Sequence, residues 1–102
     1  MNKAEIEKVL KSYGCNDSVI GFNLFVEVII LIINDIKKGE ATKYNYKLKN
    51  YYSRVAIVND FKETTIASNI LNAVTRGNRY GDGLTPKELV DIVLAKLEEK
   101  RV

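Results

Sequence analysis

Residues 21–35 read GFNLFVEVIILIIND and form the most apolar stretch of the chain. Apolar residues recur in it at spacings of three and four, the period of an α-helix. Most of the other side is apolar too, so we expect this helix to be buried nearly all round. A membrane-spanning helix needs about 18–20 apolar residues, whereas Asn23 and Glu27 interrupt a shorter run here. We therefore predict a central core helix at about residues 18–38 and no membrane span.

The chain has 102 residues, of which 46% are hydrophobic, and this suits one domain over residues 1–102. Its first ten residues, MNKAEIEKVL, are charged and amphipathic and lack the apolar core of a signal peptide. Cys15 has no second cysteine to pair with. We expect a cytoplasmic protein.

Histidine is absent, and Cys15 is the single cysteine. These residue types supply most catalytic bases, nucleophiles and soft metal ligands. We therefore expect no enzyme, no metal site and no cofactor.

Basic residues are concentrated in the middle of the chain. Residues 37–62 carry seven basic side chains against two acidic ones, a local net charge of +5 within a total of +3. Such a distribution favours an anionic partner, most often nucleic acid. A solvated lysine-rich face would give the same pattern.

Helices should flank the central one on both sides. A first helix is predicted from Lys3 to Tyr13, closed by Gly14. Asn16, Asp17 and Ser18 then offer N-cap oxygens for the central helix, and Gly39 closes it. The last helix opens with Thr85 as N-cap, Pro86 at the first position and Glu88 completing a capping box.

The segment TKYNYKLKNYYSRVAIVND, residues 42–60, contains four of the six tyrosines, interleaved with lysines. A strand is permitted by the alternation around Tyr44, but helix is favoured because the chain offers no partner strand. Lysine and tyrosine together suit a surface that faces phosphates. Tyrosines half-buried at a helix edge are the alternative.

Residues 55–74, VAIVNDFKETTIASNILNAV, have the pattern of a helix-turn-helix. Lys62 and Glu63 are the expected turn, and Thr64 or Thr65 the expected cap of the second helix. Its buried face is predicted to hold Ile66, Ile70 and Val74. The outward polar residues can bond base edges, and an ordinary exposed polar face is the alternative. The predicted base-reading residues are Ser68, Asn69, Asn72, Thr75 and Arg76.

The loop GNRYGDG, residues 77–83, does not follow a strand and lacks the pattern of a nucleotide-binding loop. We expect it to contact the DNA backbone instead. Backbone contacts should share a face with the base-reading residues. The predicted set is Lys43, Lys47, Lys49, Arg54, Lys62, Thr64, Thr65 and Arg79.

The order of these features resembles the C-terminal effector domain of the stage 0 sporulation response regulator, the sporulation initiation transcription factor of Firmicutes. The stretches that carry the resemblance are GFNLFVEVIILIIND, then Gly39 and ATK (residues 41–43), ASNILNAV, TRGN and LTPKELVDIVLAKLEEK. They cover almost the whole chain. ASNILNAV corresponds to the start of that family's recognition helix.

The resemblance implies an all-α domain of about five to six helices with a DNA-binding helix-turn-helix. It also implies double-stranded DNA as partner, action on an RNA polymerase sigma factor and paired copies on DNA. Asn69 and Asn72 stand where the family's recognition helix is rich in arginine, and we expect no receiver domain. The prediction is a stand-alone, sequence-specific regulator of transcription. The alternative is a module of the same fold that has lost DNA reading and binds a regulator or a polymerase subunit.

Overall fold

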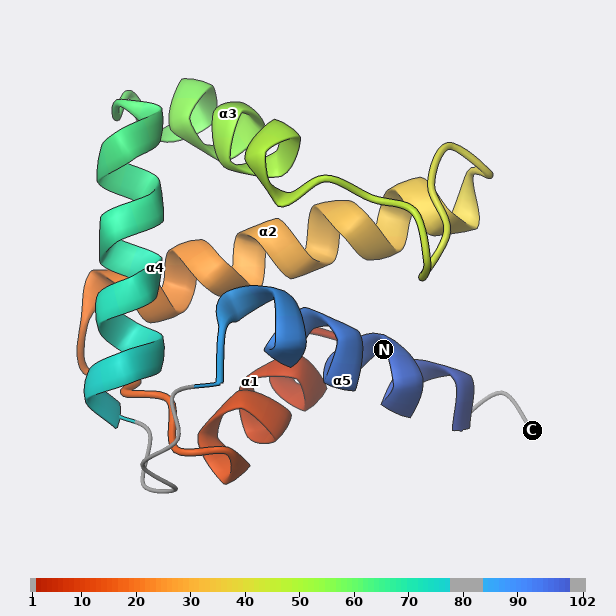
Figure 1. Ribbon diagram of the computed structural model, residues 1–102, viewed down its shortest axis with the longest axis horizontal. Helices are drawn as coiled ribbons and strands as arrows, with labels where there is room; N and C mark the ends of the chain where they lie inside the picture. The colour runs from red at the N-terminus through yellow and green to blue at the C-terminus, as the bar shows by residue number, and fades with distance from the viewer. Residues whose placement is uncertain (1, 78–83, 100–102) are drawn as a thin grey trace.

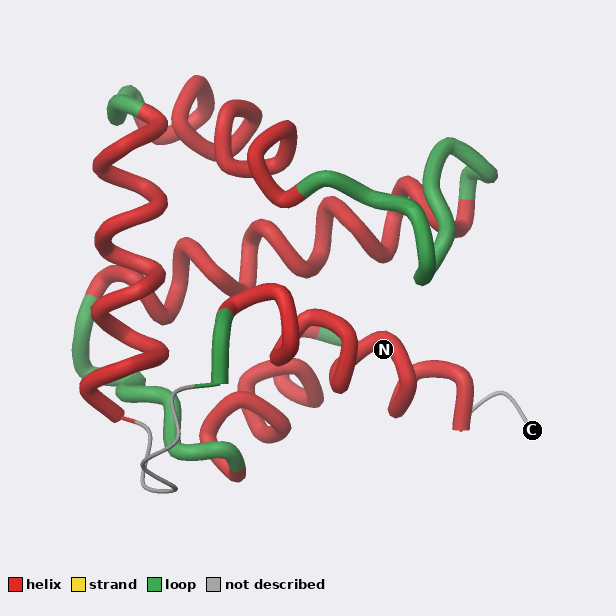
Figure 2. Tube along the Cα trace, viewed as in Figure 1, coloured by secondary structure: helices red, strands yellow, loops and turns green. Residues whose placement is uncertain are grey.

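The apolar stretch forms a helix that runs through the middle of the molecule (Figure 1). The structure is a computed structural model and describes residues 2–77 and 84–99. Helices make up its secondary structure apart from a single bridge between Thr42 and Asn45 (Figure 2). The all-α prediction is therefore confirmed. The helices are α1 (Lys3–Ser12), α2 (Ile20–Lys37), α3 (Leu48–Asn59), α4 (Glu63–Gly77) and α5 (Pro86–Glu99).

Helix α2 is the centre of the core, because α1, α3 and α4 pack against it while α5 packs against α1 and α4. In Figure 1, α3 lies on one side of α2, α1 and α5 lie on the other, and α4 crosses near its N-terminal end. Phe25, Val26, Ile29 and Ile32 are completely buried. The predicted central core helix is confirmed, and no helix in the described part of the chain is long and apolar enough to span a bilayer.

The ends of α1 and α5 follow their sequence signals. Gly14 adopts a positive φ of 86° just after α1, as expected for a glycine that ends a helix. At α5, the Glu88 amide donates to Thr85 Oγ1 at 3.2 Å, and the Thr85 amide donates to Glu88 Oε1 at 3.0 Å. The predicted capping box is therefore confirmed.

The prediction for the start of α2 is wrong in one respect. The helix begins at Ile20 after Val19, and no side chain caps it. Asn16 Oδ1 instead accepts hydrogen bonds from the Ser18 amide at 3.0 Å and the Ser18 hydroxyl at 2.6 Å. Asn and Ser side chains can bond the nearby backbone in this way. The capping oxygens are therefore used in a local turn before the helix.

Helix α3 is shorter than predicted. It starts at Leu48, because residues 42–45 close a tight turn in which the Thr42 and Asn45 backbones bond each other. Tyr44 therefore lies outside the helix, and its side chain is 85% exposed.

Helix α4 starts earlier than predicted. The Lys62 carbonyl already accepts bonds from the Thr65 and Ile66 amides, so the helix begins at Glu63. Thr64 and Thr65 lie in its first turn and do not cap it. The connection from α3 is residues 60–62.

Candidate nucleic-acid interface

Helices α3 and α4 meet at a tight connection that sets their relative direction. Asp60 adopts the left-handed conformation with φ 56° and ψ 43°. The Phe61 amide then donates back to the Ala56 carbonyl at 2.9 Å. Across the junction, the Ser53 hydroxyl donates to Glu63 Oε2 at 2.8 Å. The chain therefore leaves α3 in a defined direction and enters α4 at once.

Helix α4 is anchored on α2 through a very close approach of the two backbones. Ile66, Ile70 and Val74 are buried, as predicted. A Cβ atom added to Gly21 would lie 1.8 Å from the Asn69 carbonyl oxygen. A side chain at position 21 is therefore incompatible with the position of α4. Sequence reasoning missed this role, although a glycine inside an apolar helix is the usual sign of close packing.

The outward face of α4 is polar with one exception. Thr64, Ser68 and Thr75 are exposed, and between them the Leu71 side chain is 49% exposed. From Thr64 to Gly77 the helix carries no acidic residue. An anionic partner at this face would therefore meet no like charge beyond Glu63, the first residue of the helix.

The five predicted base-reading residues are not equally available. Ser68 and Thr75 are exposed, whereas Asn69 and Asn72 are half-buried at the edge of the face. Arg76 lies on α4, but its side chain is outside the described residues. The structure thus brings Ser68, Asn72 and Thr75 onto one side of the helix, with Asn69 closer to α2.

Local hydrogen bonds further separate these residues. The Asn69 side-chain Nδ2 donates to the Thr65 carbonyl at 2.8 Å, and the Thr75 hydroxyl donates to the Leu71 carbonyl at 2.8 Å. A hydroxyl oxygen that donates one bond can still accept others. Among the described residues, no hydrogen bond engages the Asn72 side chain. Asn72 is therefore the asparagine best placed to pair with an adenine edge.

The predicted backbone-contact residues are spread along the molecule. Lys62 is exposed and directly precedes α4, where Thr64 and Thr65 form part of the first turn. Lys47 and Lys49 are exposed at the N-terminal end of α3, whereas Lys62 follows its C-terminal end. The two ends of this 12-residue helix are about 18 Å apart. The loop between α2 and α3, residues 38–47, lies on the opposite side of the molecule from α4 and contains Lys43 (Figure 1). Arg79 lies outside the described residues.

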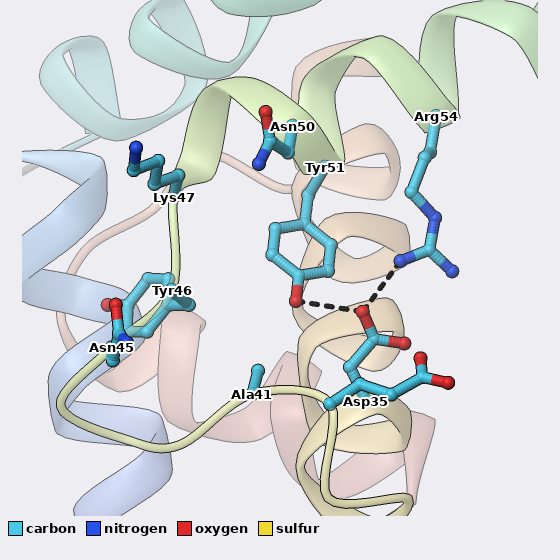
Figure 3. Close-up of a pocket in the computed structure, with 9 residues that line it drawn as sticks. Asp35, Ala41, Asn45, Tyr46, Lys47, Asn50, Tyr51 and Arg54 are labelled. Atoms are coloured by element: carbon cyan, nitrogen blue, oxygen red, sulfur yellow. Dashed lines mark hydrogen bonds and ion pairs between the residues drawn. The ribbon is translucent and has the colours of Figure 1, made fainter.

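Arg54 is held by a buried acid that sequence reasoning did not single out. Asp35 Oδ2 accepts hydrogen bonds from the Tyr51 hydroxyl at 2.9 Å and from Arg54 Nη1 at 2.8 Å (Figure 3). Burial raises the pKa of Asp35, but the hydrogen bonds from Tyr51 and Arg54 and the charges of Arg54 and Lys38 outweigh it. The pKa therefore lies below the ordinary value of 3.8. The only signal in the sequence was an acid at the end of an apolar helix.

A polar hollow of about 460 Å³ lies at the start of α3, beside this cluster. Lys47, Asn50 and Arg54 contribute to its wall (Figure 3). No side chain caps the first turn of α3. Backbone N–H groups at an uncapped N-terminus favour negatively charged groups such as phosphate.

The tyrosines of residues 42–60 have mostly structural partners. Tyr46 donates to Asp91 and also lies under the Lys87 ammonium, 4.4 Å from the ring centroid. Burial first, and then its bond to Asp35, raises the pKa of Tyr51 to about 12. The alternative of partly buried tyrosines therefore fits Tyr46, Tyr51 and the half-buried Tyr52. Tyr44 is the exposed one.

Among residues 2–77 and 84–99, no three histidine, cysteine, aspartate or glutamate side chains are grouped to hold a metal ion. No protein-family model, curated protein or solved structure matches the chain. The resemblance to the sporulation effector domain therefore remains a prediction.

Proposed function

We propose that the protein is a sequence-specific DNA-binding regulator of transcription in which α3 and α4 act as a helix-turn-helix. The observation that supports it most is α4 itself. This helix presents an exposed, acid-free face and is held rigidly by the Asp60 connection and by the contact at Gly21. A rigid helix with short polar side chains suits the major groove.

In this proposal, α4 reads the bases and flanking lysines bind phosphates. Asn72 pairs with an adenine, while Ser68 and Thr75 bond base edges or phosphates. Lys62 binds the phosphate nearest the start of α4. Lys47 and Lys49 bind a second phosphate together with the uncapped N-terminus of α3. Lys43 is too distant from α4 to join the same contact and contributes only to the general positive field.

The wider setting of the proposal comes from the resemblance alone. It comprises a cytoplasmic regulator of sporulation in Firmicutes that binds DNA as paired copies and acts on a sigma factor. The protein would work by binding, without catalysis and without a cofactor.

A mobility-shift assay against genomic DNA fragments tests the proposal. We expect at least one fragment to be retained in the presence of excess bulk competitor DNA at low salt. If every fragment is released equally by the competitor, sequence-specific reading is wrong.

Two variants separate base reading from phosphate binding. Lys49→Ala should weaken binding to specific and random DNA alike and reduce the salt slope by about 1. Asn72→Ala should weaken binding to the specific fragment by about 1–3 kcal/mol and leave random DNA unaffected. Lys3→Ala, which removes an exposed lysine at the start of α1, is the matched lysine control. If Asn72→Ala weakens binding to specific and random DNA equally, Asn72 does not read a base.

A second candidate function is suggested by Leu71. A leucine that is 49% exposed in the middle of α4 also suits contact with a protein, such as a regulator or a polymerase subunit. Leu71→Ala distinguishes the two functions in a pull-down with nuclease treatment. A nuclease-insensitive interaction that is lost in this variant would favour the protein-interaction module.

A further inference from the structure

Two adjacent residues of α3 are exposed although both are large and apolar. Ile57 and Val58 are each 81% exposed, and they follow Arg54 at spacings of three and four. These three residues therefore share a face of α3 that no described helix covers. Large apolar residues that are exposed together mark interaction surfaces more often than isolated ones do.

Beside this face lies an apolar hollow of about 180 Å³ between α2 and α3. Its wall is formed by Ile30 and Leu31 from α2 and by Val55 and Val58 from α3, with Glu27 at the rim. We call this surface, together with Ile57 and Arg54, the α2–α3 groove. Its middle is apolar, so covering it would remove hydrocarbon from water.

The two ends of the α2–α3 groove expose groups of opposite charge. At one end, Glu27 Oε2 accepts a hydrogen bond from Asn59, the last residue of α3. At the other end, Arg54 bonds Asp35, which lies two helical turns beyond Glu27 on α2. The Arg54 side chain is still 46% exposed, and only its Nη1 contacts Asp35. The groove therefore runs from an exposed carboxylate to an exposed guanidinium.

This arrangement is self-complementary. A two-fold axis through the apolar middle would bring the Glu27 end of one copy against the Arg54 end of the other, twice over. The same rotation would bring the two exposed Val58 side chains toward the facing hollows. Unlike charges at the rim guide association and fix its register, while the apolar middle supplies the affinity.

We propose that the α2–α3 groove is a dimerisation surface that binds a second copy of this chain through a two-fold axis. The proposal does not depend on DNA binding, since α4, Lys47 and Lys49 lie outside the groove. Arg54 is the one groove residue that also lines the hollow at the start of α3.

Analytical ultracentrifugation of the full chain without DNA tests the proposal. We expect a monomer at low protein concentration and a rising fraction of dimer as the concentration increases. Raising the salt concentration should weaken the dimer, because the rim pairs are solvent-exposed. A chain that stays monomeric at every concentration would overturn the proposal.

Three variants locate the surface. Val58→Glu should raise the dimer Kd by about tenfold or more, because it places a charge in the apolar middle. Glu27→Arg should also weaken the dimer, because it opposes Arg54 of the second copy with a like charge. Leu71→Glu is the matched control for an exposed apolar residue outside the groove and should leave the Kd unchanged.

Circular dichroism verifies that each variant keeps the helical content of the parent chain. Because Val58 is mostly exposed, its replacement should not unfold the protein. If folded Val58→Glu dimerises like the parent chain, or if Leu71→Glu weakens the dimer as much, the α2–α3 groove is not the dimerisation surface.

Discussion

Asp35 is the one buried charged residue in the described part of the chain. Its carboxylate keeps its charge because Tyr51 and Arg54 both donate to Oδ2. Since a buried charge without partners is very costly, these two bonds tie the start of α3 to the end of α2. The hydrogen bonds from Tyr51 and Arg54 to Asp35 therefore help to fix the position of α3 on α2. The sequence did not predict this role for Tyr51 or Arg54.

We predict that Asp35→Asn lowers the free energy of unfolding by about 1–3 kcal/mol at neutral pH, through loss of charged hydrogen bonds. The folded-state pKa of Asp35 lies below 3.8, so its charge stabilises the fold above that pH. This contribution is lost as the pH falls through 3.8 and below. The difference in the free energy of unfolding between the parent chain and Asp35→Asn should accordingly shrink on acidification.

Urea unfolding at neutral and acidic pH measures this difference. Asp17→Asn is the control, because within the described residues this exposed acid forms an ion pair only with exposed Lys11, at 3.4 Å. A difference that does not change with pH would contradict the assigned role of Asp35.

Gly21 offers a second test at the scale of one residue. In an ordinary helix interior, replacing glycine by alanine stabilises by about 1 kcal/mol. Here the added Cβ would lie 1.8 Å from the Asn69 carbonyl oxygen, so α4 would have to move. We predict that Gly21→Ala destabilises the protein by about 1–3 kcal/mol or more.

Thermal unfolding followed by circular dichroism measures the effect. Gly39→Ala is the comparison. At that site an added Cβ would meet no other atom, so the substitution is opposed only by the left-handed backbone with φ 79°. Any increase in melting temperature for Gly21→Ala would show that the two helices do not approach as closely as described.

At the scale of elements, the connection between α3 and α4 matters most for the proposed function. The pattern of apolar residues predicted both helices, but it put the turn at Lys62 and Glu63. Backbone bonds to the Lys62 carbonyl start α4 at Glu63, two to three residues earlier than a cap at Thr64 or Thr65 would. Thr64 and Thr65 therefore lie in the first turn, beside the side chains proposed to read bases.

Asp60 is the residue that makes this connection possible. The left-handed conformation costs most L-residues about 1–2 kcal/mol, and aspartate tolerates it better than branched residues do. We predict that Asp60→Gly raises the melting temperature slightly and that Asp60→Val lowers stability by about 1–2 kcal/mol. Chemical unfolding measures both, with Asp17→Gly on the surface as control. Equal stability of the two Asp60 variants would mean that the backbone conformation is not limiting.

At the scale of the whole molecule, burial raises the pKa of several side chains, so they stay neutral to a higher pH than in water. Burial raises the pKa of Cys15 to about 11 and that of Tyr52 to about 12. Tyr51 is raised to about 12 as well. Cys15 and Tyr51 are distant in sequence but belong to one core, and the half-buried Tyr52, next to Tyr51 on α3, packs against it.

We predict that stability falls as the pH rises above 9.0, the ordinary value for Cys15, and continues to fall toward 12. A folded-state pKa above the unfolded one stabilises the fold below the unfolded value, and this stabilisation is lost as the pH rises through the folded value. Tyr52→Phe should therefore make the alkaline decline shallower. Urea unfolding across this range measures the slope, with Tyr44→Phe on the 85% exposed ring as control. A slope that Tyr52→Phe leaves unchanged would contradict the prediction.

Sequence periodicity predicted that residues 21–35 form the central helix and which face of α4 is buried. These properties depend on the spacing of apolar residues along one helix, which the sequence displays directly. The all-α prediction also needed the absence of a partner strand for residues 42–60 and the family resemblance. The capping boxes and glycine ends are equally local, so Gly14 and Thr85 were interpreted correctly.

Only the tertiary structure shows that Arg54 and Tyr51 meet at Asp35 and that α4 approaches Gly21 closely. It also shows that the loop containing Lys43 lies far from α4 and that the α2–α3 groove is uncovered. Each depends on which residues distant in sequence become neighbours, and spacing along one helix carries no such information. Residues 21–35 thus determine the core by their apolar pattern. What that core presents to a partner is determined by how the other helices pack against it.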